Sequence, residues 1–171
     1  MTTKMNKEQK VVFVLSGSVF ASKIDFSQNH LPCEIEVVGR SGENFGNVRF
    51  CGKEKDNTPH LLRADILVIN GGFSAVSEAL ALGKETFIIP VPNHAEQYLN
   101  ARLLSRYGRG TITEEGLVIE ELRKILEGEK PLCPAESSGS VNAEGAREAA
   151  EIIFSIIPRP AEVQEVLVEN P

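Results

Sequence analysis

The sequence predicts an α/β fold whose core is a doubly wound, mainly parallel sheet. Short apolar, β-branched runs alternate along the chain with longer segments of helical periodicity. Several of the short runs are apolar at every position, which is typical of parallel strands covered by helices on both faces. The alternation of the two kinds of segment and the apolar character of the runs together favour a layered α/β domain.

Glycines close most of the runs that predict strands, as expected where an extended segment enters a tight turn. The first run leads into Ser16-Gly17-Ser18, and the second is followed by Gly39. In the third run, Val48 and Phe50 alternate with polar residues. The predicted strands cover residues 11–15, 35–38, 48–50, 66–69 and 86–89.

Four segments have the periodicity of helices. The first is closed by Gly83. Asn93 is predicted to cap the second, with Glu96 completing a capping box, and Gly108 is predicted to end it. The predicted helices cover residues 74–82, 94–106, 115–127 and 143–157.

The length of 171 residues predicts one domain. Residues 128–142 are rich in Gly, Pro and Ser and are predicted to form a surface connection. The helical pattern that follows them extends the predicted domain over residues 1–157. Residues 158–171 contain three prolines and several acidic residues, so they are predicted to form a C-terminal tail.

Composition excludes several classes of protein. The net charge is −6, and it divides into −8 over residues 112–171 and +2 over residues 1–111, with no basic stripe that would bind nucleic acid. No stretch reaches the roughly 18 apolar residues of a membrane-spanning helix, and residues 1–10 hold no apolar signal-peptide core. The three cysteines form no Cys-x-x-Cys pair, which suits a reducing compartment. We therefore expect a cytoplasmic protein.

The loop after the predicted strand 66–69 has the composition of an anion site. Asn70 is followed by Gly71 and Gly72, and a predicted helix begins shortly afterwards. Glycines let the backbone approach a ligand, and the free N–H groups of a helix start favour phosphate. Ser74 and Glu78 are four residues apart on one helical face, where the carboxylate could accept hydrogen bonds from a ribose diol. The alternative is an ordinary loop with a capped helix and a carboxylate near its N-terminus.

A second group of polar residues follows the predicted strand 86–89. Two prolines stiffen this loop, and Glu96, Gln97 and Asn100 occupy the first two turns of the next helix. A carboxylate beside an amide offers acceptors and donors together, which suits neighbouring sugar hydroxyls. His94 could contact phosphate or act as a base. The alternative is a capped helix with a polar, exposed face.

Together the two stretches resemble the donor half of GT-B glycosyltransferases of the macrolide, plant and peptidoglycan N-acetylglucosaminyltransferase types. The family pattern runs His-Gly-Gly, a variable residue, Gly-Ser/Thr, Glu-Ala-Leu, Gly, Pro, Asp/Glu-Gln and Asn-Ala. The resemblance covers roughly residues 10–127 and extends toward 157. The residues that match the pattern, in the same order and spacing, are Asn70-Gly71-Gly72, Glu78-Ala79-Leu80, Gly83, Pro90, Glu96-Gln97 and Asn100-Ala101.

The resemblance implies a role for each matching position. Glu78 would bind the ribose, and Phe50 and Cys51 would clamp the base through backbone groups. Two departures from the pattern concern phosphate: Asn70 replaces the usual histidine, and Ala75 replaces a Ser or Thr. The residues implied to hold the diphosphate are Gly17, Ser18, Asn70, Gly71, Gly72, Ser74 and Ala75. Those implied to bind the sugar are His94, Glu96, Gln97 and Asn100.

The implied activity is transfer of a sugar from a nucleoside diphosphate, expected to be UDP, to a lipid, glycan or small-molecule acceptor. Family members have a second, acceptor-binding domain that supplies the catalytic base, and this chain resembles only one half. We therefore expect an acceptor domain or partner subunit, through which the protein could reach a membrane surface, and no activity from this domain alone. No cofactor or essential metal is expected, and the chain has only three Asp and no Asp-x-Asp pair. The alternatives are a non-catalytic nucleotide-sugar-binding or regulatory module and, less well matched by Glu96-Gln97, a sugar-nucleotide epimerase.

Overall fold

The computed structural model describes residues 9–15, 24–27, 30–132 and 144–157. The chain divides into two compact units, residues 1–141 and residues 142–171. The predicted diphosphate residues Gly17 and Ser18 and the predicted tail 158–171 lie outside the described residues. No helix in the described part of the chain is long and apolar enough to cross a membrane.

The first unit is built on a six-stranded sheet in the order β3-β2-β1-β4-β5-β6, and every pairing between neighbours is parallel. The chain moves outward from β1 to β3, then returns to the other side of β1 and moves outward again from β4 to β6. This reversal confirms the doubly wound α/β fold. The strands are β1 (Lys10–Val14), β2 (Glu34–Val38), β3 (Val48–Gly52), β4 (Ile66–Ile69), β5 (Glu85–Ile88) and β6 (Gly110–Ile112).

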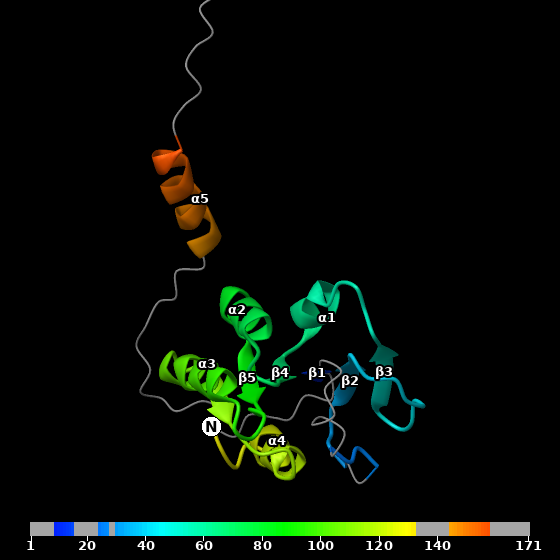
Figure 1. The fold of residues 1–171 in the computed structure, drawn as a ribbon. Coiled ribbons are helices and arrows are strands. Elements are labelled where there is room, and N and C mark those ends of the chain that lie inside the picture. The colour runs from blue at the N-terminus through cyan, green and yellow to red at the C-terminus, as the bar shows by residue number, and fades with distance from the viewer. Residues whose placement is uncertain (1–8, 16–23, 28–29, 133–143, 158–171) are drawn as a thin grey trace, which may run out of the picture. The chain divides into compact units, whose positions relative to one another are not determined.

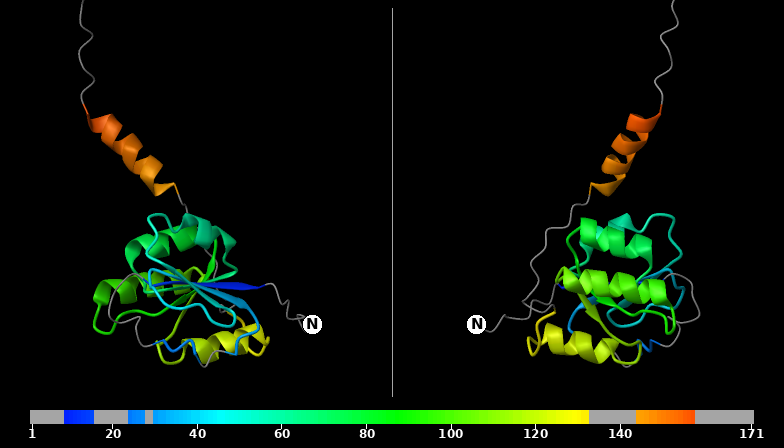
Figure 2. Two further views of the ribbon diagram at one scale, coloured as in Figure 1. Left: turned by 90° about the vertical axis from the view of Figure 1, so that its right-hand side faces the viewer. Right: turned by 60° about the vertical axis from the view of Figure 1, so that its left-hand side comes forward.

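Helices cover both faces of this sheet (Figure 1). The helices α1, α2 and α3 lie on one face and α4 on the other, as the turned views also show (Figure 2). Alternation along the strands explains this: Phe13 and Val68 pack with Leu122 of α4, whereas Val12 and Leu67 face the other three helices. The helices of the first unit are α1 (Thr58–Arg63), α2 (Phe73–Ala81), α3 (Ala95–Arg106) and α4 (Val118–Leu126).

Two elements were not predicted from the sequence, α1 and β6. Helix α1 has six residues, including a proline in its first turn, which is too short for a periodic pattern. Strand β6 has three residues and begins at Gly110, a residue type that weakens strand propensity. A Cβ at Gly110 would lie 2.6 Å from Cδ1 of Ile88 and 3.1 Å from Cγ of Leu104, so packing between β5 and α3 requires the glycine.

The start of α3 differs from the prediction by one residue. Asn93 has a φ of +64°, which is outside the helical region, and the N-cap is His94. Nδ1 of His94 accepts a hydrogen bond from the backbone N–H of Gln97 at 3.4 Å, which is the contact expected of a capping side chain. The predicted capping box between Asn93 and Glu96 is therefore wrong, although a side-chain cap is present.

The described part of the second unit is α5 (Gly145–Ile156). None of its residues is buried, and its large apolar side chains include Ile153 and Phe154. The boundary between the units falls within the connection predicted over residues 128–142. A single domain over residues 1–157 stays a prediction.

Candidate functional site

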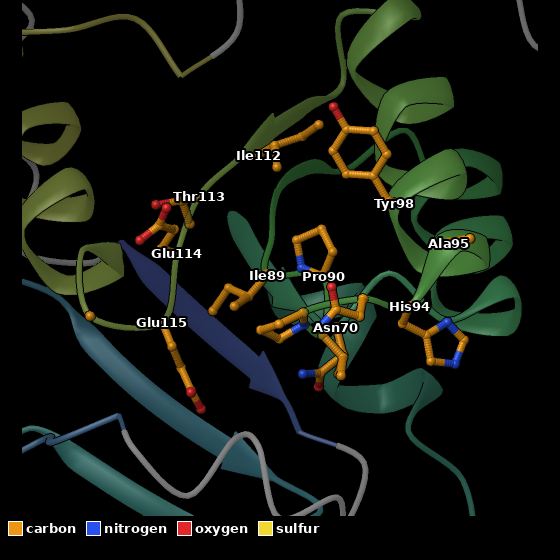
Figure 3. Close-up of a pocket in the computed structure, with 14 residues that line it drawn as sticks. Asn70, Ile89, Pro90, His94, Ala95, Tyr98, Ile112, Thr113, Glu114 and Glu115 are labelled. Atoms are coloured by element: carbon orange, nitrogen blue, oxygen red, sulfur yellow. The ribbon is translucent and has the colours of Figure 1, made fainter.

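A pocket of about 810 Å³ lies where β4, β5 and β6 end (Figure 3). This is the edge of a doubly wound sheet at which ligands bind, and the volume is that of a small-molecule site. The loop after β5 and the turn between β6 and α4 supply most of its wall. The lining residues are Asn70, Ile89, Pro90, Val91, Pro92, Asn93, His94, Ala95, Tyr98, Ile112, Thr113, Glu114, Glu115 and Gly116.

Two amide side chains of α3 hold the surrounding loops in place. Nδ2 of Asn100 donates to the backbone oxygen of Gly71 at 3.0 Å, which ties α3 to the Gly-Gly loop after β4. Oε1 of Gln97 accepts from the backbone N–H of Val91 at 2.9 Å, which fixes the loop after β5. The two stretches that the sequence singled out are therefore joined directly by the hydrogen bond between Asn100 and Gly71. Neither Gln97 nor Asn100 lines the pocket.

Gly71 is the point of closest approach between the two stretches. Its φ is +78°, in the left-handed region that favours glycine. A Cβ at this position would lie 2.9 Å from the backbone oxygen of Gln97 and 3.1 Å from Cγ2 of Ile88. Glycine is therefore required by the packing of α3 against the loop, independently of any ligand.

Helix α2 begins directly after the Gly-Gly loop. Gly72 is its N-cap, no side chain caps it, and its first turn contains no acidic residue. The first helical hydrogen bond runs from the N–H of Val76 to the oxygen of Gly72, so the preceding amides point out of the first turn. Ser74 and Glu78 are exposed on this helix, Ala75 is half-buried, and none of the three lines the pocket.

The remaining predicted sugar and base residues are distributed unevenly. His94 lines the pocket, whereas the exposed Glu96 does not. Phe50 and Cys51 lie on β3, at the opposite edge of the sheet from β6, and do not line the pocket. The N–H of Phe50 donates to Oδ1 of Asn44 at 2.8 Å. The structure therefore brings the Gly-Gly loop and α3 together beside this pocket, which Asn70 and His94 line and Gly71 and Gly72 do not. It leaves the predicted base residues apart from them.

Residues 4–128 match the family described as Glycosyl transferase family 1. The chain belongs to this family. It is 28% identical over 171 aligned positions to the UDP-N-acetylglucosamine–N-acetylmuramyl-(pentapeptide) pyrophosphoryl-undecaprenol N-acetylglucosamine transferase of Rubrobacter xylanophilus, covering 86% of this chain and 50% of the relative. It is 30% identical over 87 residues to an uncharacterized glycosyltransferase of Methanosarcina acetivorans, covering 48% of this chain and 23% of the relative.

Solved structures agree with the family at the level of the fold. Acinetobacter baumannii MurG superposes with a TM-score of 0.60 at 14% identity, over 87% of this chain and 50% of that chain. The glycotransferase of kitacinnamycin superposes with a TM-score of 0.59 at 21% identity, over 91% of this chain and 45% of that chain. The resemblance to one half of a GT-B fold is confirmed, and this glycosyltransferase family 1 chain spans at most about half the length of these relatives.

A second polar cluster of this family 1 domain lies on β2, β3 and α1. Ligand atoms of Glu36, Cys51 and His60, which are residue types that bind Zn²⁺, lie within 4.8 Å of one another. Nδ1 of His60 is 2.8 Å from Oε2 of Glu36, and Nζ of Lys10 is 3.2 Å from Oε1. The two oxygens of Glu36 therefore already have partners within the protein, and Nδ1 of His60 carries the hydrogen of its bond.

The surroundings of Glu36 and Cys51 shift the pKa values of both side chains. Burial raises the pKa of Glu36, but the hydrogen bonds from His60 and Lys10 and the charges of Lys10 and Arg63 outweigh burial and lower it to about 2. Burial raises the pKa of the Cys51 thiol. The ion pairs and hydrogen bonds of Glu36 with Lys10, His60 and Arg63 account for the arrangement of these side chains.

Several pocket residues were missed by sequence reasoning because β6 was missed. Thr113, Glu114 and Glu115 follow this strand and line the pocket. The β-branched run 111–113 after Gly110 was the available signal for a short strand. Recognising that strand would have placed the turn after it at the carboxyl edge of the sheet, beside the loops after β4 and β5.

Proposed function

We propose that this chain is the donor-binding half of a glycosyltransferase and that it binds a nucleoside diphosphate sugar, with UDP as the expected nucleotide. The observation that carries the proposal is the hydrogen bond between Asn100 and Gly71. It holds the start of α2 and the start of α3 together beside the pocket at the carboxyl edge of the sheet. The curated relative from Rubrobacter xylanophilus, whose name specifies UDP-N-acetylglucosamine, supports uridine as the base.

The start of α2 is suited to the diphosphate. Its first-turn amides are not capped by a side chain, and no acidic residue in that turn opposes an anion. In the proposed reaction these N–H groups stabilise the negative charge that develops on the departing diphosphate. Gly71, Gly72, Ser74 and Ala75 form this segment, and Glu78 lies further along α2, where the ribose would follow the phosphates.

The sugar would extend from the diphosphate toward α3 and the pocket. His94 already lines this pocket, and Glu96 is exposed close to it in sequence. The amide oxygen of Gln97 accepts the hydrogen bond from Val91, and the amide nitrogen of Gln97 takes no part in that bond. In this proposal the amide nitrogen of Gln97 donates to a sugar hydroxyl.

The other half of the enzyme would bind the acceptor and supply the catalytic base. The chain spans about half of the relative from Rubrobacter xylanophilus and of MurG, which supports a need for a second domain or subunit. A cytoplasmic location and access to a membrane surface through that partner belong to the same proposal. So does the absence of any required cofactor or metal.

A second candidate is a nucleotide-sugar-binding or regulatory module without catalysis. The two departures from the family pattern at phosphate positions, Asn70 and Ala75, favour it. Both functions predict binding of a sugar nucleotide. They differ in whether a partner that supplies the acceptor site restores sugar transfer.

Calorimetric titration of the chain with UDP, UDP-N-acetylglucosamine, UDP-glucose and GDP tests the proposal. The expected result is binding of uridine nucleotides, tightened by one of the two sugars. Binding of GDP in preference to UDP would contradict the expected base, and no binding of any of the four would contradict the proposed function. Sugar transfer by the chain alone would contradict the requirement for a second half.

A further inference from the structure

Two buried side-chain oxygen atoms in the described part of the chain have no hydrogen-bond partner. They are Oδ1 of Asn70 and Oε1 of Glu115, and both residues line the pocket. Buried polar groups in native proteins are nearly always paired, so each exception requires an explanation. The two atoms belong to residues of one pocket, so a molecule bound in that pocket could supply their partners.

The two residues come from different elements and reach the same region. Asn70 directly follows β4 and is 8% exposed. Glu115 lies in the turn between β6 and α4. In Figure 3 both side chains extend to the same side of the pocket, below Ile89 in that view. Because alternation along β4 places Val68 on the face covered by α4, Asn70 continues onto that face, where the turn before α4 also lies.

The unpaired oxygens of Asn70 and Glu115 favour a ligand that carries hydrogen-bond donors. An ionised carboxylate offers only acceptors, and the unpaired atom of Asn70 is also an acceptor. A phosphate in contact with Glu115 would place two negative charges together, so this end of the pocket excludes the diphosphate. Much of the remaining wall is apolar, including Ile89, Pro90 and Ile112. A sugar ring supplies hydroxyl donors and an apolar face together.

From these observations we infer that Glu115 accepts hydrogen bonds from hydroxyl groups of the donor sugar, with Asn70 as a second acceptor in the same pocket in place of the diphosphate contact that the family resemblance implies for it. This inference rests on the proposed function and adds a specificity-determining residue from the turn after β6. Glu115 discriminates a nucleotide that carries a sugar from one that does not.

The test compares affinities for UDP-N-acetylglucosamine and UDP, measured by calorimetry on the full chain. Glu115→Ala is expected to weaken binding of UDP-N-acetylglucosamine by roughly tenfold or more and to change binding of UDP less than about threefold, because hydrogen bonds to charged groups are strong. Glu115→Gln keeps one acceptor oxygen and is expected to lose less affinity for UDP-N-acetylglucosamine than Glu115→Ala. The matched control is Glu85→Ala, at the exposed amino end of β5, which is expected to change neither affinity.

Thermal unfolding without ligand separates a binding role from a structural one. Removing a carboxylate whose buried oxygen has no partner is expected to leave the unfolding midpoint of Glu115→Gln unchanged or higher. A lower midpoint, equal losses for both nucleotides, or undiminished binding of UDP-N-acetylglucosamine by Glu115→Ala would overturn the inference alone. Failure of the unmodified chain to bind either nucleotide would overturn the proposed function and this inference with it.

Discussion

Glu36 is a buried carboxylate, whereas Glu115 is half-buried with one buried oxygen, and the surroundings of the two side chains differ. The oxygens of Glu36 accept hydrogen bonds from Lys10 and His60, and Arg63 lies 3.5 Å away. Oε1 of Glu115 has no partner. A carboxylate whose partners are all supplied by the fold stabilises the fold, whereas one that lacks a partner is available to a ligand. Burial by itself therefore does not distinguish a structural carboxylate from a binding one.

The largest expected effect follows from removing the charge of Glu36. Glu36→Gln leaves Lys10 and Arg63 without their shared anion and is expected to lower the free energy of unfolding by about 3 kcal/mol. Urea denaturation at neutral pH measures this change. The control is Glu34→Gln, because Glu34 also pairs with Lys10, at 3.1 Å, but is 67% exposed. Its expected cost is below about 1 kcal/mol.

Acid should abolish the difference between the unmodified chain and Glu36→Gln. The pKa of Glu36 is lowered from 4.5 to about 2 in the folded state, so its contribution to stability is complete above the unfolded value. That contribution is lost as the pH falls through about 2, where the folded carboxylate takes up its proton. The gap in unfolding free energy between the two proteins should therefore narrow as the pH falls from 4.5 toward 2. A constant gap across this range would show that the difference between the two proteins does not arise from the charge of Glu36.

A smaller loss is expected at the junction of the two loops. Gly71→Ala places a Cβ at a φ of +78° and 2.9 Å from the backbone oxygen of Gln97. Strain and the close contact together are expected to cost about 2 kcal/mol of unfolding free energy. Gly116→Ala is the control, because nothing lies within 4 Å of its added Cβ and its φ is not positive. Equal stability of the two variants in thermal unfolding would show that the loop can shift away from α3.

The parts of the fold that the sequence predicted are those determined by local composition. Strand β4 was predicted at its observed bounds, residues 66–69, because an apolar run buried on both faces is visible in the residues themselves. Strand β6 was not, because its three residues depend on packing: Gly110 fits only since Ile88 and Leu104 fill the space beside it. Elements defined by their neighbours leave little trace in their own composition.

The candidate site shows the same division. The Gly-Gly loop and the polar start of α3 were both singled out from the sequence, but the hydrogen bond from Asn100 to Gly71 that joins them could not be predicted from spacing. Glu115 was assigned to a helix that in fact begins at Val118. Its unpaired oxygen is a property of the surrounding tertiary structure and has no counterpart in the sequence.

The smallest effect concerns Asn100, which stands between the residues that stabilise the fold and those that bind a ligand. The sequence predicts that Asn100 binds the sugar, yet the amide nitrogen of Asn100 already donates a hydrogen bond to Gly71. Asn100→Ala is expected to lower the free energy of unfolding by about 1 kcal/mol, the usual net value of a neutral hydrogen bond. Thermal or urea unfolding measures this, with Arg102→Ala, an exposed position two residues further along α3, as the control.

The same variant also reports on binding. If the hydrogen bond to Gly71 positions the start of α2, its loss should weaken the binding of UDP and of UDP-N-acetylglucosamine by similar factors, since both carry the diphosphate. Glu115→Ala should instead affect only the nucleotide that carries a sugar. Selective loss of UDP-N-acetylglucosamine in Asn100→Ala, with stability unchanged, would place Asn100 among the residues that contact sugar and remove it from those that hold the loops. The ratio of the two affinities therefore separates a residue that positions the site from one that binds the substrate.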